Sequence, residues 1–280
     1  MLVFFNGRLI EESEAAISIH DRGFLYGDGL FETLRVVNGR PVRWTEHYSR
    51  LSQGANFFQI PLLYYSGELQ KFASELVSAN KTPESVIRIH LSRGPGARGY
   101  SPRNSGPPTL IMAVHPVEPI IPGQPKLWRL AASSFRVLAS DPLASFKHSN
   151  KLPHICARAE AESAGADEAL LLNNEGQLAE TTSANLFWVE RNVLCTPPPA
   201  SGALPGIVRS EVLALAYAAG LQAIEKNSTP DVLESASAVF CTNSVHGIIE
   251  ITHLNGRPAP RSAIPAKLNH LYWQKALSQD

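Results

Sequence analysis

The chain has 280 residues, of which 44% are hydrophobic, so it can bury the core of one large domain or of two smaller ones. Its 25 basic and 25 acidic residues give a formal net charge of zero, so no overall field favours nucleic acid or an anionic membrane. The three cysteines, Cys156, Cys195 and Cys241, are widely spaced, which predicts neither a disulfide framework nor a metal site and suits a reducing cytoplasm. A signal segment and a membrane span of about 18 apolar residues are not expected either.

The first half of the chain predicts a small sheet covered by helices. Asn6-Gly7 favours a tight turn between two short strands, because both residues accept positive φ angles. Thr45 and Ser66 are candidate N-caps of two amphipathic helices. A long loop rich in glycine and proline, Arg93–Pro108, is a candidate functional segment. Further strands are predicted over residues 30–37, 86–92 and 110–117.

A run of prolines marks the predicted domain boundary. Proline recurs at every third residue from Pro116 to Pro125, which favours an extended linker over a helix. We therefore expect a smaller N-terminal α/β domain over residues 1–118, a linker over 119–126 and a larger C-terminal domain over 127–280.

The second half predicts a further mixture of helices and strands, so the whole chain is expected to be a two-domain α/β protein. A strand over Glu168–Leu172 is predicted to turn at Asn173–Gly176 into a single returning strand that ends near Trp188. Helices are expected over 154–163, after Pro205, after Thr229-Pro230 and from about Ala263, with one more strand over 238–242.

Two residues of this half form a candidate catalytic pair. Lys147 precedes a predicted helix, and Glu180 lies on a predicted strand. A lysine amine can form a Schiff base with a carbonyl cofactor, and a carboxylate can keep a pyridine nitrogen protonated so that the ring accepts electrons. Taken alone, either residue would more often be a solvated surface charge, and Lys151 is the alternative lysine.

The residues around this pair resemble a known family. Lys147-His148-Ser149-Asn150 resembles the K-x-x-N segment of the class IV aminotransferases, and residues 180–187, ETTSANLF, resemble their E-x-[ST]-x-[SA]-N-[LI]-F segment. Residues 26–36, YGDGLFETLRV, resemble the family's N-terminal signature. The resemblance implies fold type IV of the pyridoxal phosphate enzymes, a fold like that of D-amino acid transaminases, with pyridoxal 5'-phosphate as cofactor.

The same resemblance implies which residues bind the cofactor. Lys147 would carry it as a Schiff base, and Glu180 would meet the pyridinium nitrogen. The phosphate would bind at a helix N-terminus, where backbone amides are free to donate, and at a turn of small polar residues. The residues expected at the phosphate are Arg50, Ile207, Val208, Asn243 and Ser244.

The loop at Ser92–Ser101 indicates the reaction. It resembles the S-R-G-x-G-[GA]-R-G-Y-S loop of the aminodeoxychorismate lyases in this family. Arg98 and Tyr100 are therefore candidate ligands of a dicarboxylate, because guanidinium pairs with carboxylate in a bidentate manner. Phe31, where D-amino acid transaminases tend to have tyrosine, also favours a lyase.

The resemblance thus implies elimination of pyruvate from aminodeoxychorismate to give 4-aminobenzoate for folate synthesis. Lys147 would move the proton of the amine-bearing carbon, and Lys147 or Thr33 would protonate the leaving group. The alternatives are a D-amino acid or branched-chain transaminase and a protein that binds the cofactor without catalysis. The family also implies a homodimer, in which the loop around Arg98 could serve the partner's site.

Overall fold

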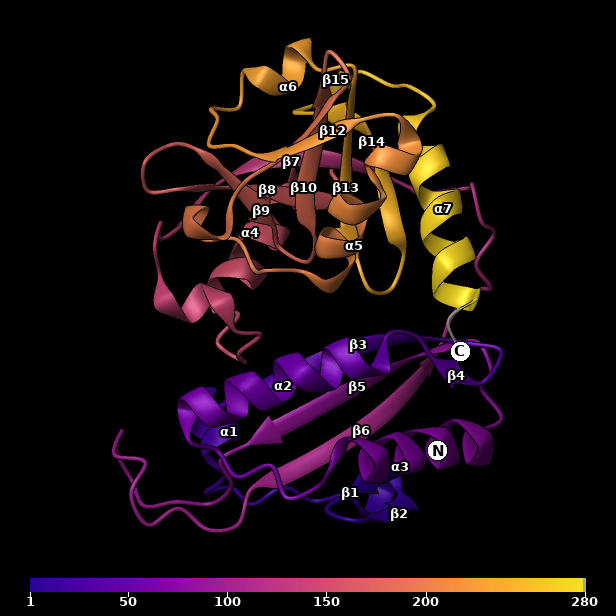
Figure 1. The fold of residues 1–280 in the computed structure, drawn as a ribbon. Helices are drawn as coiled ribbons and strands as arrows, with labels where there is room; N and C mark the ends of the chain where they lie inside the picture. Colours follow the sequence, from indigo (N-terminus) through magenta and orange to yellow (C-terminus); the bar gives the residue numbers. More distant parts are fainter. Residues whose placement is uncertain (279–280) are drawn as a thin grey trace. The chain divides into compact units, whose positions relative to one another are not determined.

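Two separate sheets organise the chain in the computed structural model, which describes residues 1–278 (Figure 1). Residues Met1–Ile120 together with Phe146–Asn150 form one compact unit, and Ile121–Ser145 together with the residues from Lys151 onward form the other. Each unit has its own core of buried side chains. The predicted α/β class is therefore confirmed.

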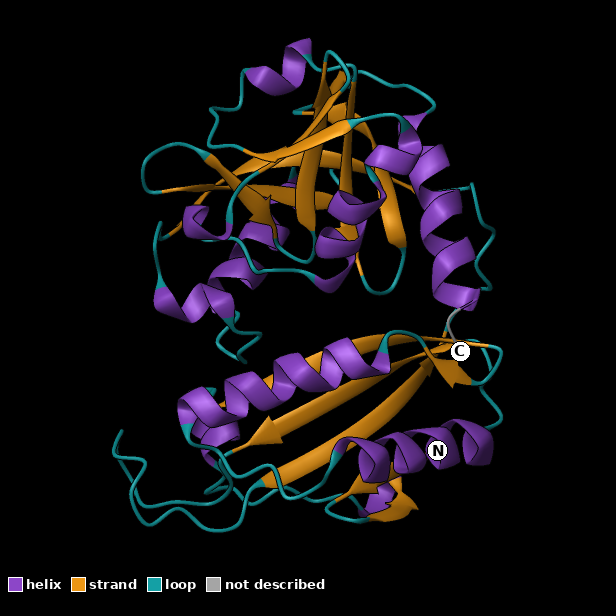
Figure 2. Ribbon diagram, in the orientation of Figure 1, coloured by secondary structure: helices purple, strands orange, loops and turns teal. Residues whose placement is uncertain are grey.

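The first unit is built on a six-stranded antiparallel sheet in the order β2-β1-β6-β5-β3-β4. Two helices cover one face of this sheet, and a short helix precedes β3 (Figure 2). The strands are β1 (Leu2–Phe5), β2 (Arg8–Glu11), β3 (Gly29–Val37), β4 (Arg40–Pro41), β5 (Ser85–Ser92) and β6 (Thr109–Pro116). The helices are α1 (Arg22–Tyr26), α2 (Trp44–Phe58) and α3 (Ser66–Asn80).

Strand β3 separates the core of this unit from a polar face. Leu30 and Leu34 are buried in the core that α2 and α3 share with the sheet. Because successive side chains of a strand point to opposite faces, Phe31 and Thr33 lie on the other side of the sheet from the two leucines. The sheet can therefore present chemical groups on the face that the helices leave uncovered.

The second unit contains a nine-stranded sheet in the order β12-β11-β10-β13-β14-β7-β8-β9, and β15 pairs with β14. Strand β9 also pairs with β10, so six of these strands close into a ring. The strands are β7 (Lys126–Val137), β8 (Glu168–Asn173), β9 (Leu178–Thr181), β10 (Asn185–Glu190), β11 (Val193–Thr196), β12 (Gln222–Glu225), β13 (Ala238–Asn243), β14 (Gly247–Leu254) and β15 (Arg257–Pro258). The helices are α4 (Leu152–Ser163), α5 (Ile207–Leu215), α6 (Val232–Ser235) and α7 (Ile264–Ser278).

Several predicted boundaries differ from the structure. Helix α2 begins at Trp44, and its N-cap is Arg43 in the left-handed region, so the prediction of Thr45 as N-cap is wrong. Helix α3 begins at Ser66, and Tyr65 is its N-cap, where its backbone N–H donates to Glu68 Oε2 at 2.8 Å. Both candidate caps therefore lie in the first turn of their helix.

The segment Phe146–Asn150 packs with the first unit, whereas the predicted boundary placed it in the C-terminal domain. The reason is backbone pairing with the start of β3. The Phe31 N–H donates to the Lys147 carbonyl at 2.9 Å, and the Ser149 N–H donates to the Gly29 carbonyl at 2.9 Å. Lys147 is accordingly outside any helix, because α4 begins at Leu152.

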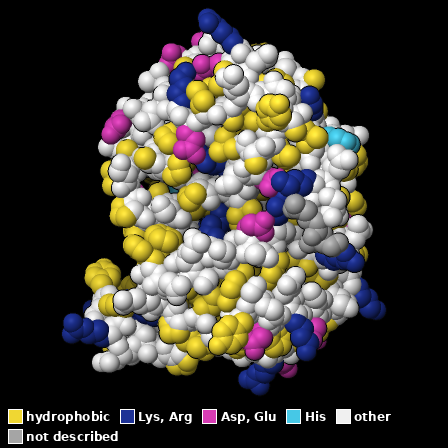
Figure 3. Space-filling model, in the orientation of Figure 1, with side chains coloured by type: hydrophobic (Ala, Val, Ile, Leu, Met, Phe, Trp, Pro, Cys, Tyr) yellow, Lys and Arg dark blue, Asp and Glu magenta, His cyan; other side chains and the backbone are white. Residues whose placement is uncertain are grey.

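The surface carries mixed charges. On the face seen in Figure 3, Lys and Arg side chains are interspersed with Asp and Glu, as the zero formal net charge leads one to expect. In the part of the chain that the structure describes, no helix combines the length and apolar character needed to span a membrane.

Candidate functional site

Lys147 lies beside the helix-free face of β3 in the first unit. Its Nζ atom is 4.6 Å from the centroid of the Phe31 ring. Three residues further on, Asn150 donates from Nδ2 to the Gly27 carbonyl at 2.9 Å. Gly27 has a φ of 66°, and a Cβ there would lie 2.8 Å from Asn150 Oδ1. The K-x-x-N segment and the glycine before β3 are therefore fitted to each other.

Arg88 of β5 completes this face. Its guanidinium carbon lies 3.8 Å from the Phe31 ring centroid, and Nη1 donates to Thr33 Oγ1 at 3.3 Å. Its Nε donates to His90 Nε2 at 2.9 Å. Burial, and then the charge of Arg88, lower the pKa of His90 to about 4, so this imidazole is neutral at pH 7. Lys147, Thr33 and a cation therefore surround one aromatic ring.

On the helix side of β3, Glu32 orients the predicted phosphate ligand Arg50. Glu32 is 1% exposed and accepts from Arg50 Nε at 2.7 Å and Nη2 at 2.8 Å, and His47 Nδ1 lies 2.7 Å away. Burial alone would raise the pKa of Glu32, but Arg50 and then His47 bring it to about 2. The ionised carboxylate therefore fixes the plane of the Arg50 guanidinium.

In the second unit, Glu180 of β9 is nearly buried and its carboxylate is held in place. Oε2 accepts from the Leu204 backbone N–H at 3.0 Å and from Asn185 Nδ2 at 3.4 Å. His154 of α4 approaches Oε1, with its Nε2 at 3.8 Å. Asn185 also donates to the Leu204 carbonyl at 2.7 Å. The orientation of Glu180 thus depends on the segment that precedes α5.

The predicted single returning strand is wrong, because residues 182–184 separate β9 from β10. In this turn the hydroxyl of Thr182 donates to the buried Glu168. Ser183 Oγ donates to the same carboxylate at 2.5 Å, and Arg158 Nη1 donates to it at 3.1 Å. A buried carboxylate therefore holds the turn between Glu180 and Asn185.

Ile207 and Val208 are the first two residues of α5, as the phosphate prediction requires, and Gly206 is the N-cap. The first backbone amides of a helix have no acceptor within the helix and carry the positive end of its dipole. A Cβ on Gly206 would lie 2.0 Å from Asn185 Oδ1, so this glycine permits a close approach of β10 to the helix start.

The end of β13 provides a second polar turn. Asn243 Oδ1 accepts from the two backbone amides that follow Ser244, at 3.1 and 2.9 Å, so this side chain closes its own turn. Thr242 stands opposite Asn185 in the register of β13 and β10. Its buried Oγ1 has no hydrogen-bond partner among residues 1–278. An acceptor from outside the chain would satisfy this hydroxyl.

The two lysines differ in environment. Burial lowers the pKa of Lys151, although the charges of Glu180 and Asp141 oppose this. Lys151 belongs to the second unit and Lys147 to the first. Both remain chemically suited to attack a carbonyl group, since a lysine amine must be neutral to do so.

The predicted substrate residues of the loop between β5 and β6 are exposed. Tyr100 is 87% exposed, and its ring lies 5.6 Å from that of Tyr26. Arg98 is exposed as well, whereas Phe31 is buried beneath the Arg88 cation.

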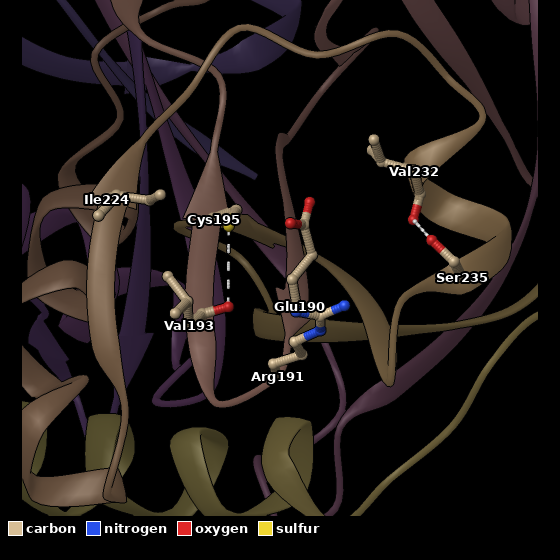
Figure 4. A pocket seen from close by; sticks show the side chains of 7 residues that line it. All are labelled: Glu190, Arg191, Val193, Cys195, Ile224, Val232 and Ser235. Carbon is tan, nitrogen blue, oxygen red and sulfur yellow. Dashed lines mark hydrogen bonds between the residues drawn. The ribbon is translucent and has the colours of Figure 1, made fainter.

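A pocket of about 570 Å³ in the second unit lies elsewhere (Figure 4). Glu190, which lines it, is at the opposite end of β10 from Asn185 and pairs with Lys226 at 3.0 Å. None of the predicted site residues lines this pocket, which is formed by Glu190, Arg191, Val193, Cys195, Ile224, Val232 and Ser235.

The family model for amino-transferase class IV matches residues 29–254. The chain belongs to this family. The match confirms the resemblance indicated by the K-x-x-N and E-x-[ST]-x-[SA]-N-[LI]-F segments. Membership of class IV does not fix the reaction, because one fold can host several chemistries.

Relatives of this class IV chain include both transaminases and lyases. A D-alanine aminotransferase from Bacillus licheniformis is 33% identical over 258 residues, covering 92% of this chain and 89% of that protein. An aminodeoxychorismate lyase from Vibrio harveyi is 30% identical over 257 residues, covering 91% of this chain and 92% of that protein.

Solved structures confirm the class IV fold. A branched-chain aminotransferase from Thermoproteus uzoniensis with norvaline superimposes with a TM-score of 0.90 at 30% identity, covering 100% of this chain and 96% of that one. A branched-chain amino acid aminotransferase from a T.th. strain, with pyridoxamine 5'-phosphate, gives a TM-score of 0.90 at 26% identity, covering 100% of this chain and 95% of that one.

The sequence analysis missed several residues of the class IV site. Arg88 and His90 alternate with the apolar Ile87 and Ile89, and this period of two could have indicated a polar sheet face. Glu32 gave no such signal, because its role depends on α2, which lies next to it only in the folded chain.

Proposed function

We propose that this class IV chain is a pyridoxal 5'-phosphate enzyme that eliminates pyruvate from aminodeoxychorismate and releases 4-aminobenzoate, a precursor of folate. The observation that carries the choice of a lyase is the contact of Arg88 with Thr33 on the sheet face beside Lys147. A guanidinium that donates to a hydroxyl oxygen makes that hydroxyl a better proton donor. Elimination needs such a donor for the leaving group, whereas transamination does not.

The residues present fit the cofactor. The buried Thr242 hydroxyl, which has no partner among the described residues, and the start of α5 suit a phosphate. The oriented carboxylate of Glu180 suits a pyridinium nitrogen. When bound, the cofactor would supply an electron sink for the carbanion formed at the substrate. Asn243, Ser244, Ile207, Val208 and Arg50 remain the proposed phosphate contacts.

Each side chain has a role in the proposed reaction. Lys147 takes the proton from the amine-bearing carbon of the substrate. Thr33 delivers a proton to the leaving enolpyruvyl group as its C–O bond breaks, and the loss of the first proton makes the product ring aromatic. Arg88, together with Arg98 and Tyr100, binds the substrate's carboxylates. Phe31 supports both Arg88 and Lys147 through its ring.

The test is the release of 4-aminobenzoate and pyruvate from aminodeoxychorismate generated in place by its synthase, with no keto acid added. Equimolar products that disappear in Lys147→Ala would support the proposal. A yellow, borohydride-reducible protein without product would contradict it and favour the alternative reaction.

That alternative is transamination of D-amino or branched-chain amino acids. It is favoured by the similarity to the D-alanine aminotransferase and by Arg88, which would equally suit the carboxylate of an amino acid. A reaction that requires a keto acid would identify it. A cofactor spectrum unchanged by every amine would instead indicate a protein that binds the cofactor without catalysis.

The proposal includes a cytoplasmic homodimer, as the resemblance implies. Light scattering of the purified protein at several concentrations tests the oligomeric state, and cell fractionation tests the location. A monomer at all concentrations would contradict the first part, and recovery outside the cytoplasm the second.

A further inference from the structure

A buried arginine ties down the loop that carries the proposed substrate residues. Arg22 of α1 is 3% exposed. Its Nη1 donates to the Gly99 carbonyl at 2.9 Å, and its Nη2 donates to the Tyr100 carbonyl at 3.1 Å. Its Nε donates to Asp28 Oδ2 at 2.8 Å. The guanidinium thus joins the main chain of the loop to the segment before β3.

Further contacts hold the same stretch of the loop. The Gly99 N–H donates to the Tyr26 hydroxyl at 3.0 Å, and the rings of Tyr26 and Tyr100 meet edge to face at 5.6 Å. A Cβ on Gly96 would lie 2.8 Å from Cδ of Arg22, so the loop passes directly over this side chain. The backbone that follows Arg98 is therefore fixed from α1.

Arg93 shares Asp28 with Arg22 but does not hold the tip of the loop. It donates to Asp28 from Nε at 2.8 Å and from Nη2 at 3.1 Å. It also donates to the Phe58 and Gln59 carbonyls at the end of α2, at 2.8 and 3.1 Å. The two arginines therefore share one carboxylate, and Arg22 is the one that contacts Gly99 and Tyr100.

We propose that Arg22 is a positioning residue for substrate recognition, which acts by fixing the backbone next to Arg98 and at Tyr100. This inference rests on the proposed function, in which Arg98 and Tyr100 contact the substrate. An exposed loop without this anchor would have to be ordered at each binding event, which weakens binding without changing the chemical groups. Arg22 therefore sets KM, while kcat depends on Lys147 and Thr33.

The first test needs no substrate. Trypsin cleaves after Arg98 and Arg103, which are both exposed in the loop, and mass spectrometry identifies the fragments. We expect Arg22→Lys to be cleaved at these sites about tenfold faster than the wild type, because hydrogen bonds from a charged group are lost. Arg93→Lys is the matched control and should be cleaved at the wild-type rate. Equal rates for Arg22→Lys and the wild type would overturn the proposal.

The second test separates KM from kcat in whichever reaction the holoenzyme catalyses. Arg22→Lys should raise KM about tenfold and leave kcat within about twofold, whereas Arg93→Lys should change neither. A loss of kcat with KM unchanged would overturn the positioning role. If the wild type has no activity, the proposed function fails, and the proteolysis comparison still decides whether Arg22 anchors the loop.

Should Arg22→Lys fail to fold, Tyr26→Phe decides the question. It removes the hydroxyl that accepts from the Gly99 N–H and keeps the ring against Tyr100. The expected result is faster cleavage after Arg98 and a smaller rise in KM of about threefold. If Tyr26→Phe matches the wild type in both measurements, the loop is not positioned from α1.

Discussion

The side-chain oxygen of Asn185 lies 2.0 Å from the point where a Cβ atom on Gly206 would stand. The nitrogen of the same amide donates to Leu204 and lies 3.4 Å from Glu180 Oε2. One side chain therefore connects the proposed pyridinium ligand with the start of α5, where the phosphate is proposed to bind. The separation of these two contacts is fixed before any cofactor arrives.

This connection predicts the effect of Gly206→Ala. The φ of Gly206 is −72°, which alanine adopts easily, so only the contact with Asn185 opposes the substitution. We expect a loss of about 1–3 kcal/mol in the free energy of unfolding and a rise of about tenfold or more in the dissociation constant of pyridoxal 5'-phosphate. Thermal unfolding of the apoprotein and a spectroscopic titration would measure the two effects.

Gly67 of α3 supplies the control for that substitution, because nothing lies within 4 Å of its added Cβ. Gly67→Ala should leave cofactor affinity unchanged and keep or slightly raise stability. Wild-type cofactor affinity in Gly206→Ala would show that Asn185 does not set the geometry of the site.

The choice between the two lysines can be tested directly. Borohydride reduction of the holoenzyme, followed by peptide mass mapping, should place the cofactor on Lys147. We expect Lys147→Ala to lose the reducible adduct completely and Lys151→Ala to retain it. Labelling of Lys151, whose pKa is lowered by burial, would instead assign the covalent role to the second unit.

Thr33 should separate elimination from transamination. Thr33→Val keeps the shape of the side chain and removes the hydroxyl that accepts from Arg88. Loss of a general acid typically lowers a rate by about 100-fold or more, so we expect that fall in lyase kcat. Thr33→Ser should retain most of the activity, and any transamination by the same enzyme should survive in both variants. Undiminished lyase activity in Thr33→Val would remove Thr33 from the mechanism.

The buried Glu32 makes stability depend on pH in acid. Its pKa is about 2 in the folded protein and 4.5 in an unperturbed glutamate, so folding favours the ionised form. This contribution, on the order of 3 kcal/mol, is fully present above pH 4.5 and is lost as pH falls towards 2. Urea unfolding between pH 6 and 3 should show the decline, within the range where the protein stays folded.

Glu32→Gln should flatten that part of the pH profile and destabilise the protein at pH 7. Glu46→Gln is the comparison, because Glu46 pairs with Arg43 at the surface, where ion pairs contribute little. If the two variants have the same pH profile, Glu32 is not the group responsible.

Local patterns predicted most of the elements in the first unit. Asn6-Gly7 and Asn38-Gly39 have the positive φ angles of tight turns, and the adjoining strands follow from them. The start of α2 could not be predicted in this way, because Arg43 takes a left-handed conformation without a capping side chain. Strand β7 was missed because it begins at Lys126, directly after the proline run that indicated only a linker.

The site was predictable where a residue acts alone and not where it acts through distant partners. The segments around Lys147 and Glu180 could be identified because their motifs are continuous in sequence. Glu168 could not, since an acidic residue at the start of a strand is expected at the surface. It is buried only because Thr182, Ser183 and Arg158 surround its carboxylate in the fold.

The pairing of Phe146–Asn150 with β3 also limits how such a chain can evolve by recombination. The first unit is not encoded by one continuous stretch, since its last residues follow a passage through the second unit. An exchange between relatives at a point between residues 120 and 146 would take Lys147 from one parent and its partners Gly29 and Phe31 from the other. The lysine and the strand that seats it must therefore be inherited together, or diverge only in step.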